Sequence, residues 1–204
     1  MKPWKVILLV FVAVIVAAVA YGASVIRRGF SARDEASTLE TVVASAVRKI
    51  SIPRVAREKQ NPWKDAATPE IMAGARAHWA DHCATCHAND GSGQTEIGQN
   101  LYPKAPDMRL PATQNLTDGE LYYIIRNGIR LTGMPAWGDP ELQQDDESWH
   151  LVLFIRHLPQ ITPEELKVME RLNPKTEAQR AADEEAERFL NEGIAPQSHE
   201  QMRH

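Results

Sequence analysis

Two cysteines and a histidine stand within five consecutive residues of this chain, in the segment Cys83-Ala84-Thr85-Cys86-His87. Thiols at this spacing can reach the two vinyl groups on one edge of a porphyrin, and the imidazole that follows can bind the iron. A covalently held haem is a large apolar body, so the chain would have to fold around it. The segment therefore predicts a haem c site with His87 as the proximal iron ligand.

Other sites built from closely spaced cysteines need further partners. A structural zinc site needs four ligands, but Cys83 and Cys86 are the only cysteines, and His78 and His82 crowd the same segment. A thioredoxin-like redox pair follows a strand, whereas the residues before Cys83 have helical spacing. A disulfide between the two cysteines is the remaining alternative outside the cytosol.

An uncharged apolar run extends from Val6 to Ile26, close to the N-terminus. As a helix its 21 residues would be roughly 31 Å long, which matches a hydrocarbon core of about 30 Å. We expect a retained transmembrane anchor. A cleaved secretory signal that ends near Ala18-Val19-Ala20 is the alternative, and both interpretations export the rest of the chain.

Location and charge narrow the classes of partner. Haem c is attached on the outer face of the energy-transducing membrane, so we expect a membrane-anchored protein with its haem domain on that face or in the periplasm. The chain has 23 basic and 27 acidic residues, a formal net charge of −4, and no block of basic residues interleaved with aromatics. Nucleic acid is therefore not expected as a partner.

Helical spacing and helix breakers divide the chain into four predicted parts. They are a transmembrane anchor, residues 1–28; a stalk or linker, residues 29–67; a core domain, residues 68–160; and a charged C-terminal extension, residues 161–204. The stalk contains an amphipathic helix between Arg33 and Lys49, which Pro53 ends. The extension contains an acidic helix from about Glu177 to Leu190 with a thin apolar stripe.

Three core helices are expected in residues 68–160. The first begins at Thr68, an N-cap followed by proline, and runs into the cysteine motif. The second begins at the capping box Thr117-Asp118-Gly119-Glu120 and ends near Gly128, and the third extends from Asp145 to Pro159. No segment alternates as a strand would, so the fold class is all-α.

The sixth position of the iron separates electron transfer from catalysis and gas binding. Gly133-Met134-Pro135 offers a thioether in an irregular loop after the second core helix, and we predict Met134 as the second axial ligand. The predicted metal ligands are thus His87 and Met134. Three histidines in helical segments are weaker candidates: His82, His150 and His157.

Cys-Ala-Thr-Cys-His followed by Gly-Met-Pro-Ala-Trp, with a helix before the first segment and after the second, resembles a class I monohaem cytochrome c domain. The resemblance covers residues 68–160 and implies three or more helices wrapped around one covalently bound haem c. In that family a proline carbonyl accepts a hydrogen bond from the proximal imidazole, which makes Pro106 the candidate and Pro103 the alternative. A transmembrane helix and a stalk helix would precede this domain, and an acidic helical or partly disordered tail would follow it.

The resemblance implies an electron carrier and not an enzyme, passing single electrons between respiratory partners. The partners would be redox proteins of unspecified identity, and no small-molecule substrate is expected. Two alternatives remain open: the cytochrome subunit of a larger oxidoreductase complex, and a haem-based sensor or peroxidase in which the bond to Met134 yields to a small ligand.

Overall fold

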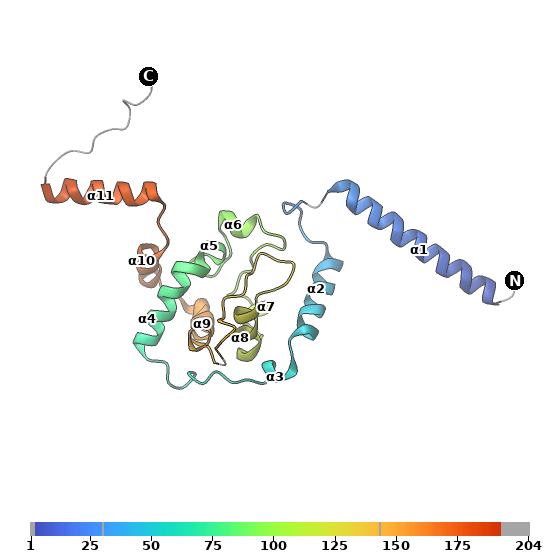
Figure 1. The fold of residues 1–204 in the computed structure, drawn as a ribbon, viewed down its shortest axis with the longest axis horizontal. Helices are drawn as coiled ribbons and strands as arrows, with labels where there is room; N and C mark the ends of the chain where they lie inside the picture. The colour runs from blue at the N-terminus through green and yellow to red at the C-terminus, as the bar shows by residue number, and fades with distance from the viewer. Residues whose placement is uncertain (1–2, 30, 143, 193–204) are drawn as a thin grey trace, which may run out of the picture.

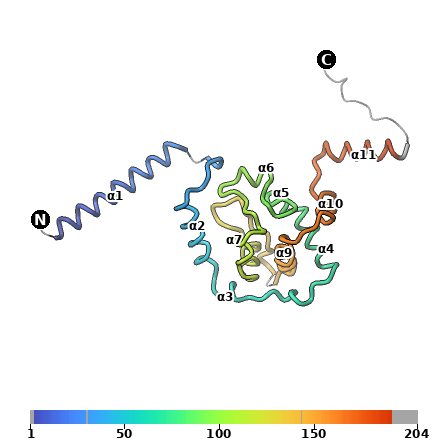
Figure 2. The backbone as a smooth tube through the Cα atoms, turned by 180° about the vertical axis from the view of Figure 1, so that it is seen from behind, coloured from blue at the N-terminus to red at the C-terminus, as the bar shows by residue number. Residues whose placement is uncertain are grey.

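A computed structural model describes residues 3–29, 31–142 and 144–192, and within these ranges it contains helices and turns but no strand. The expected all-α fold is confirmed. Packed helices form a central domain, and a helical arm extends from each side of it (Figures 1 and 2). The N-terminal arm is α1 (Pro3–Arg28), and the C-terminal arm is α11 (Glu177–Glu192).

Helix α1 contains the predicted apolar run. It has 26 residues, none of them is buried, and it is the one helix among the described residues that is long and apolar enough to cross a membrane. A signal sequence near the N-terminus can meet the same criteria of length and apolar composition. The helix is therefore confirmed, and its retention as an anchor stays a prediction.

The stalk folds into two helices, α2 (Thr38–Ser51) and α3 (Arg54–Arg57). A capping box begins α2, because the Ser37 hydroxyl accepts from the amide of Glu40 and the Glu40 carboxylate accepts from the amide of Ser37. The amphipathic helix expected between Arg33 and Lys49 is thus present, with bounds shifted by a few residues.

Three packed segments make up the core of the domain. The first is a continuous helical segment of α4 (Pro69–His78), the π-helical turn η1 (Trp79–Cys83) and α5 (Ala84–His87). The other two are α8 (Asp118–Asn127) and α9 (Asp146–His157), and α9 packs against both α4 and α8. All three predicted core helices are confirmed. Their largest fully buried side chains are Trp79, Val152, Phe154 and Ile155.

Between α5 and α8 the chain forms an irregular loop with two short helices, α6 (Glu96–Gln99) and α7 (Pro111–Gln114). Backbone hydrogen bonds close this loop on itself. The amide of Met108 donates to the Gly91 carbonyl at 2.8 Å, and the amide of Ala105 donates to the Gly98 carbonyl at 2.9 Å. The proline-rich segment therefore lies against the residues that follow the cysteine motif.

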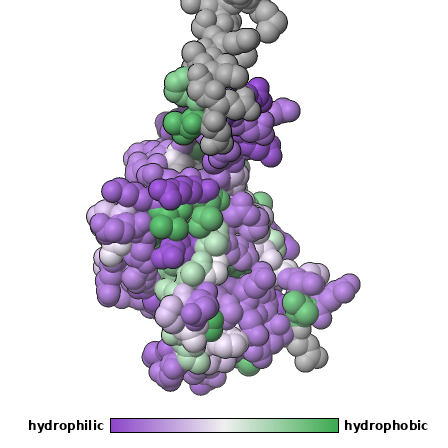
Figure 3. Space-filling view, turned by 90° about the vertical axis from the view of Figure 1, so that its left-hand side faces the viewer, coloured by the Kyte–Doolittle hydropathy of each residue, from purple (hydrophilic) through white to green (hydrophobic). Residues whose placement is uncertain are grey.

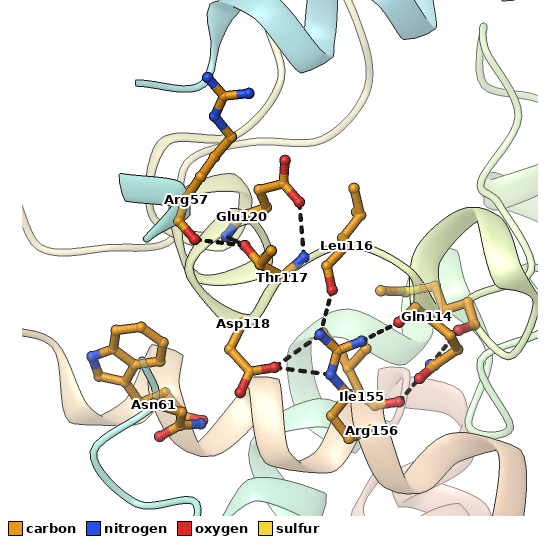
Figure 4. A network of polar contacts seen from close by, with 11 residues as sticks. Arg57, Asn61, Gln114, Leu116, Thr117, Asp118, Glu120, Ile155 and Arg156 are labelled. Atoms are coloured by element: carbon orange, nitrogen blue, oxygen red, sulfur yellow. Dashed lines mark hydrogen bonds and ion pairs between the residues drawn. The ribbon is translucent and has the colours of Figure 1, made fainter. Parts of the chain in front are cut away.

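Arg156 of α9 ties this loop to the start of α8 (Figure 4). Its guanidinium donates to the carbonyls of Gln114 and Leu116 and to the carboxylate of Asp118, at 2.5 to 3.0 Å. The side chain is partly buried, so these charged hydrogen bonds are shielded from water. They fix where α8 begins relative to α9.

The second half of the stalk also packs on the domain. Ile52 is 2% exposed, and the buried amide of Asn61 donates to the Trp149 carbonyl at 3.0 Å. The Thr117 hydroxyl at the start of α8 donates to the carbonyl of Arg57 at 2.9 Å, as Figure 4 shows. Residues 52–61 therefore behave as part of the domain, whereas α2 has no buried residue.

Beyond residue 160 the chain continues to contribute to the core. A 3-10 turn, η2 (Leu158–Gln160), leads into α10 (Pro163–Leu172), which packs against α4 and η1. Met169 of α10 is fully buried in the main hydrophobic cluster. Glu165 of α10 accepts from Arg76 of α4 at 3.2 Å and lies 2.9 Å from the ring nitrogen Nε2 of His157. Helix α11 forms where the acidic helix is expected, and the rest of the predicted tail lies outside the described residues.

Candidate haem site

The cysteine motif lies at the end of the first core segment, directly after the π-helical turn. In that turn the amide of Ala84 donates to the carbonyl of Trp79, five residues earlier. Cys83 and Cys86 are both free thiols and lie on consecutive turns of the helix. A π turn adds one residue to a helix and is common at functional sites. Here it sets the direction in which the motif projects from α4.

Burial keeps the three motif side chains uncharged. Desolvation, with a smaller contribution from Cys86, raises the pKa of the Cys83 thiol to about 12. Burial also raises the pKa of Cys86 and lowers the pKa of His87. His87 is thus a neutral imidazole at neutral pH, which is the form that binds iron.

The ring of His87 is held on one side by Trp79. The two ring centroids are 5.9 Å apart, and the Trp79 indole donates to the carbonyl of Ala88 at 3.0 Å. Ala88 has a φ of 61°, a left-handed conformation that turns the chain away after the motif. The carbonyl of His87 accepts from the amide of Gly93 at 2.8 Å. These bonds fix the backbone on which the imidazole is carried.

Nδ1 of His87 is buried and has no hydrogen-bond partner among the described residues. Pro106, the predicted acceptor for this ring, is exposed, and its carbonyl oxygen lies beside Gly93, where a Cβ would come within 3.1 Å of it. The bond from His87 to Pro106 is thus not formed in this structure, although Pro106 lies in the loop next to the motif. Its role stays a prediction.

Met134 lies in a tight loop whose backbone is well tied. Its carbonyl accepts from the amide of Ile129 at 3.1 Å, and its amide donates to the Thr132 hydroxyl at 3.1 Å. The backbone of this loop also approaches Gly128 so closely that a Cβ there would lie 2.7 Å from the Met134 carbonyl oxygen. Gly128 has a φ of 64°, so glycine is favoured for both conformation and space.

Neighbours of Met134 touch the cysteine-motif side of the domain. Trp137 stacks on His82 of η1, with ring centroids 5.4 Å apart and an angle of 10° between the planes. Gly133 lies so close to Leu101, just after α6, that a Cβ would collide with that side chain. The loop that carries Met134 is therefore brought to the part of the domain that carries Cys83 and His87.

Among the methionines that the structure describes, Met134 is the one outside the hydrophobic cluster. Met169 is buried within that cluster, and Met72 and Met108 pack against it. Buried methionines usually serve to fill apolar space. Met134 is half-buried and does not belong to that cluster, and its role as a ligand stays a prediction.

The three alternative histidines have other surroundings. His82 stacks on Trp137 as described, and His157 pairs with Glu165. The ring of His150 meets the ring of Trp63 edge-on at 4.9 Å. The ring nitrogen Nε2 of His150 is buried and has no hydrogen-bond partner in the part of the chain that the structure describes.

These residues fit a covalently bound haem. Cys83 and Cys86 supply two unpaired thiols, and His87 supplies a neutral imidazole. A nitrogen and a thioether are together a suitable donor set for a low-spin haem iron. His87 and Met134 would hold the iron, and the two cysteines would hold the porphyrin.

Two features of the site have no clear signal in the sequence. The Thr95 hydroxyl donates to the Cys86 carbonyl at 3.1 Å and accepts from the Gly98 amide at 2.8 Å. Gly98 itself lies directly against the Cys86 carbonyl, with no room for a Cβ. Helix α6 therefore supports the motif from outside, through contacts that helical spacing does not predict.

Comparison with known families agrees with this geometry. Residues 70–155 match the family model described as cytochrome C oxidase, cbb3-type, subunit III. No curated protein matches the chain. The matched range begins in α4 and ends in α9, so it contains the cysteine motif and the Met134 loop but neither the stalk nor α10.

Proposed function

We propose that the chain, whose residues 70–155 form a cytochrome c domain, is a membrane-anchored carrier of single electrons. The family implies covalently bound haem c, electron transfer through it, and redox proteins as partners. The proposal adds three points: one haem ligated by His87 and Met134, anchoring through α1, and a haem domain on the outer face of the membrane.

The chain's own residues would hold the iron in an environment suited to rapid one-electron exchange. When bound, the haem supplies an iron that alternates between the ferric and ferrous states. His87 presents a neutral nitrogen from a backbone fixed by Trp79 and Gly93. The Met134 thioether favours ferrous iron over ferric iron, so it raises the reduction potential. The backbones of His87 and Met134 are held by hydrogen bonds, so either residue would move little when the iron changes its oxidation state.

One observation carries the ligand assignment. Every other methionine in the described residues is engaged in the apolar cluster, while Met134 lies outside it, in a loop that contacts η1 through Trp137. An iron with a histidine on one side and an available thioether on the other would be six-coordinate. A filled sixth position supports electron transfer and works against gas binding or peroxidase activity.

The test compares the haem-loaded full chain in detergent with its Met134→Ala and Met108→Leu variants. The wild type and Met108→Leu should show the ferric methionine-to-iron charge-transfer band, because leucine can replace Met108 where it packs against the cluster. Met134→Ala should lose the band and have a lower reduction potential. A high-spin wild type that binds carbon monoxide would refute the proposal, and so would loss of the band in Met108→Leu alone.

A cytochrome subunit of a larger oxidoreductase complex is the second candidate function. The observation in its favour is the matched family model, which is described as subunit III of an oxidase. Purification from native membranes under mild detergent decides between the two. Co-purification of stoichiometric membrane subunits would support the complex, whereas recovery of this chain alone would support a separate carrier.

A further inference from the structure

Helix α2 has an apolar face that no described residue covers. Within the helix, apolar side chains share one side, and at 100° per residue they span an arc of about 140°. Their exposed fractions range from 51% to 80%, and they are Leu39, Val42, Val43, Val47 and Ile50. We call these five residues the α2 stripe. Contiguous exposed apolar surface of this kind marks an interaction site.

The helix is held in place while its stripe stays uncovered. The capping box at Ser37 fixes its start, and Ile52, directly after its last residue, is 2% exposed against the domain. The face of the molecule that Figure 3 shows is by contrast mostly hydrophilic, with apolar residues in small patches. The α2 stripe is therefore a preformed feature of the stalk and differs from that surface.

The position of α2 in the chain limits what can cover it. Nine residues separate the end of α1 from the start of α2, and a connection of that length spans at most roughly 35 Å when fully extended. Lys104 of the domain pairs with Glu35 within this connection at 3.0 Å, which shortens the usable length. Helices α1 and α2 also lie on one side of the domain, opposite α10 and α11, in both views (Figures 1 and 2). A bilayer that contains α1 would thus be close to α2.

Charge also favours a lipid surface. From Thr38 to Arg57 the chain has four basic residues and one acidic residue, Glu40. Arg48 and Lys49 lie in the last turn of α2, on the side away from the stripe or at its margin. Arg54 is paired with Glu58 at 2.7 Å, so its charge is partly offset. A helix with an apolar stripe and basic residues on its polar side is typical of helices that lie in the headgroup region of anionic bilayers.

We propose that α2 lies on the outer surface of the membrane that α1 spans, with its stripe among the acyl chains and headgroups of anionic lipids. This rests on the anchoring part of the proposed function. The consequence concerns the haem domain, because Arg57 of α3 accepts from Thr117 at the start of α8, and Gly119 of α8 is packed against the carbonyl of Ala56. The bilayer contact of α2 would therefore set the orientation of the domain that carries Met134.

The test places single fluorescent labels on the haem-loaded full chain in vesicles of phosphatidylethanolamine and phosphatidylglycerol. Cys83 and Cys86 are the only two cysteines of the chain and would be bonded to the haem in the loaded protein, so an introduced cysteine would be its only free thiol. Val43→Cys labels the stripe, Thr41→Cys labels the polar side two residues away, and Val14→Cys labels α1. Brominated lipids then report which labels contact acyl chains. An unchanged haem spectrum confirms that each variant is folded.

We expect the label at Val43→Cys to lose about half of its fluorescence with brominated lipid and the label at Thr41→Cys to lose little. Equal exposure of both labels to water would refute the proposal. A Val43→Cys label that is shielded from water but insensitive to brominated lipid would also refute it, in favour of a second copy or a protein partner. The label at Val14→Cys distinguishes failure of the anchoring proposal from failure of the α2 proposal. If brominated lipid does not quench this label, α1 is not inserted in the bilayer.

Discussion

Replacing Met169 with alanine should destabilise the domain strongly, because this side chain is fully buried although it comes from α10, beyond the predicted end of the domain. It lies in the same hydrophobic cluster as Trp79 and Phe154, and α10 packs on α4 and η1. The substitution removes three heavy atoms beyond Cβ and leaves a cavity that the neighbouring helices can fill only in part. The loss thus includes both transfer and cavity contributions.

Methionine-to-alanine changes at fully buried sites cost about 2–5 kcal/mol. Since Met169 is 0% exposed, we expect a loss of about 3 kcal/mol in the free energy of unfolding. For a domain of this size that corresponds to a drop of about 10 °C in Tm. Val168→Ala is the matched control, because its side chain is 43% exposed in the same turn of α10. It should change Tm by only a few degrees.

The measurement is thermal and urea unfolding of the haem-loaded full chain, followed by circular dichroism and by haem absorbance. Met169→Ala should shift both signals together, since η1 leads directly into the cysteine motif. Equal midpoints for Met169→Ala and Val168→Ala would refute the reasoning and leave α10 as a peripheral helix. A shift seen only by circular dichroism would show that α10 unfolds separately from the haem site.

Three further predictions concern α6, α4 and α10. Gly98→Ala should destabilise the domain by about 1–3 kcal/mol and reduce the yield of haem-loaded protein, because a Cβ would collide with the Cys86 carbonyl. Gly74→Ala, in open space on α4, should stabilise it by about 0.5–1 kcal/mol, and unfolding midpoints check both. Burial alone would raise the pKa of Glu165. Hydrogen bonds outweigh this effect, the largest of them from His157, and lower the pKa of Glu165 below its ordinary value of 4.5. The ionised Glu165 carboxylate therefore stabilises the folded domain above pH 4.5, and this contribution is lost as the pH falls through the lowered pKa. Glu165→Gln should therefore cost about 1–2 kcal/mol at pH 7 and progressively less as the pH falls below 4.5, and a difference that stays constant on acidification would contradict the assignment.

Helix positions were predictable from local chemistry. Thr68 and Thr117 each accept from a backbone amide three residues later, as their N-cap patterns indicate, and Gly128 ends α8 as expected. The same local rules placed α2 and α11 correctly within a few residues. These successes share one cause, because a cap or a breaker acts through residues only three or four positions away.

Contacts between distant residues were not predictable in the same way. Arg156 bonds residues about 40 positions away, and Asn61 bonds the backbone of Trp149 across 88 positions. The docking of α10 depends on Met169, which belongs to a segment of largely charged residues. The site follows the same division: the cysteine motif can be found in a single sequence, but the support from Thr95 and Gly98 depends on the folded backbone.

The π-helical turn makes the direction of the cysteines depend on chain length. One residue in an α-helix corresponds to a rotation of about 100°, so the same residues from Trp79 to Cys83 wound as a regular helix would turn the motif away from its present direction. The π turn absorbs the additional residue, and a further single-residue insertion in this stretch would therefore be far less tolerated than substitutions of its exposed side chains. The geometry of the site is encoded here in a count of residues as much as in their chemistry.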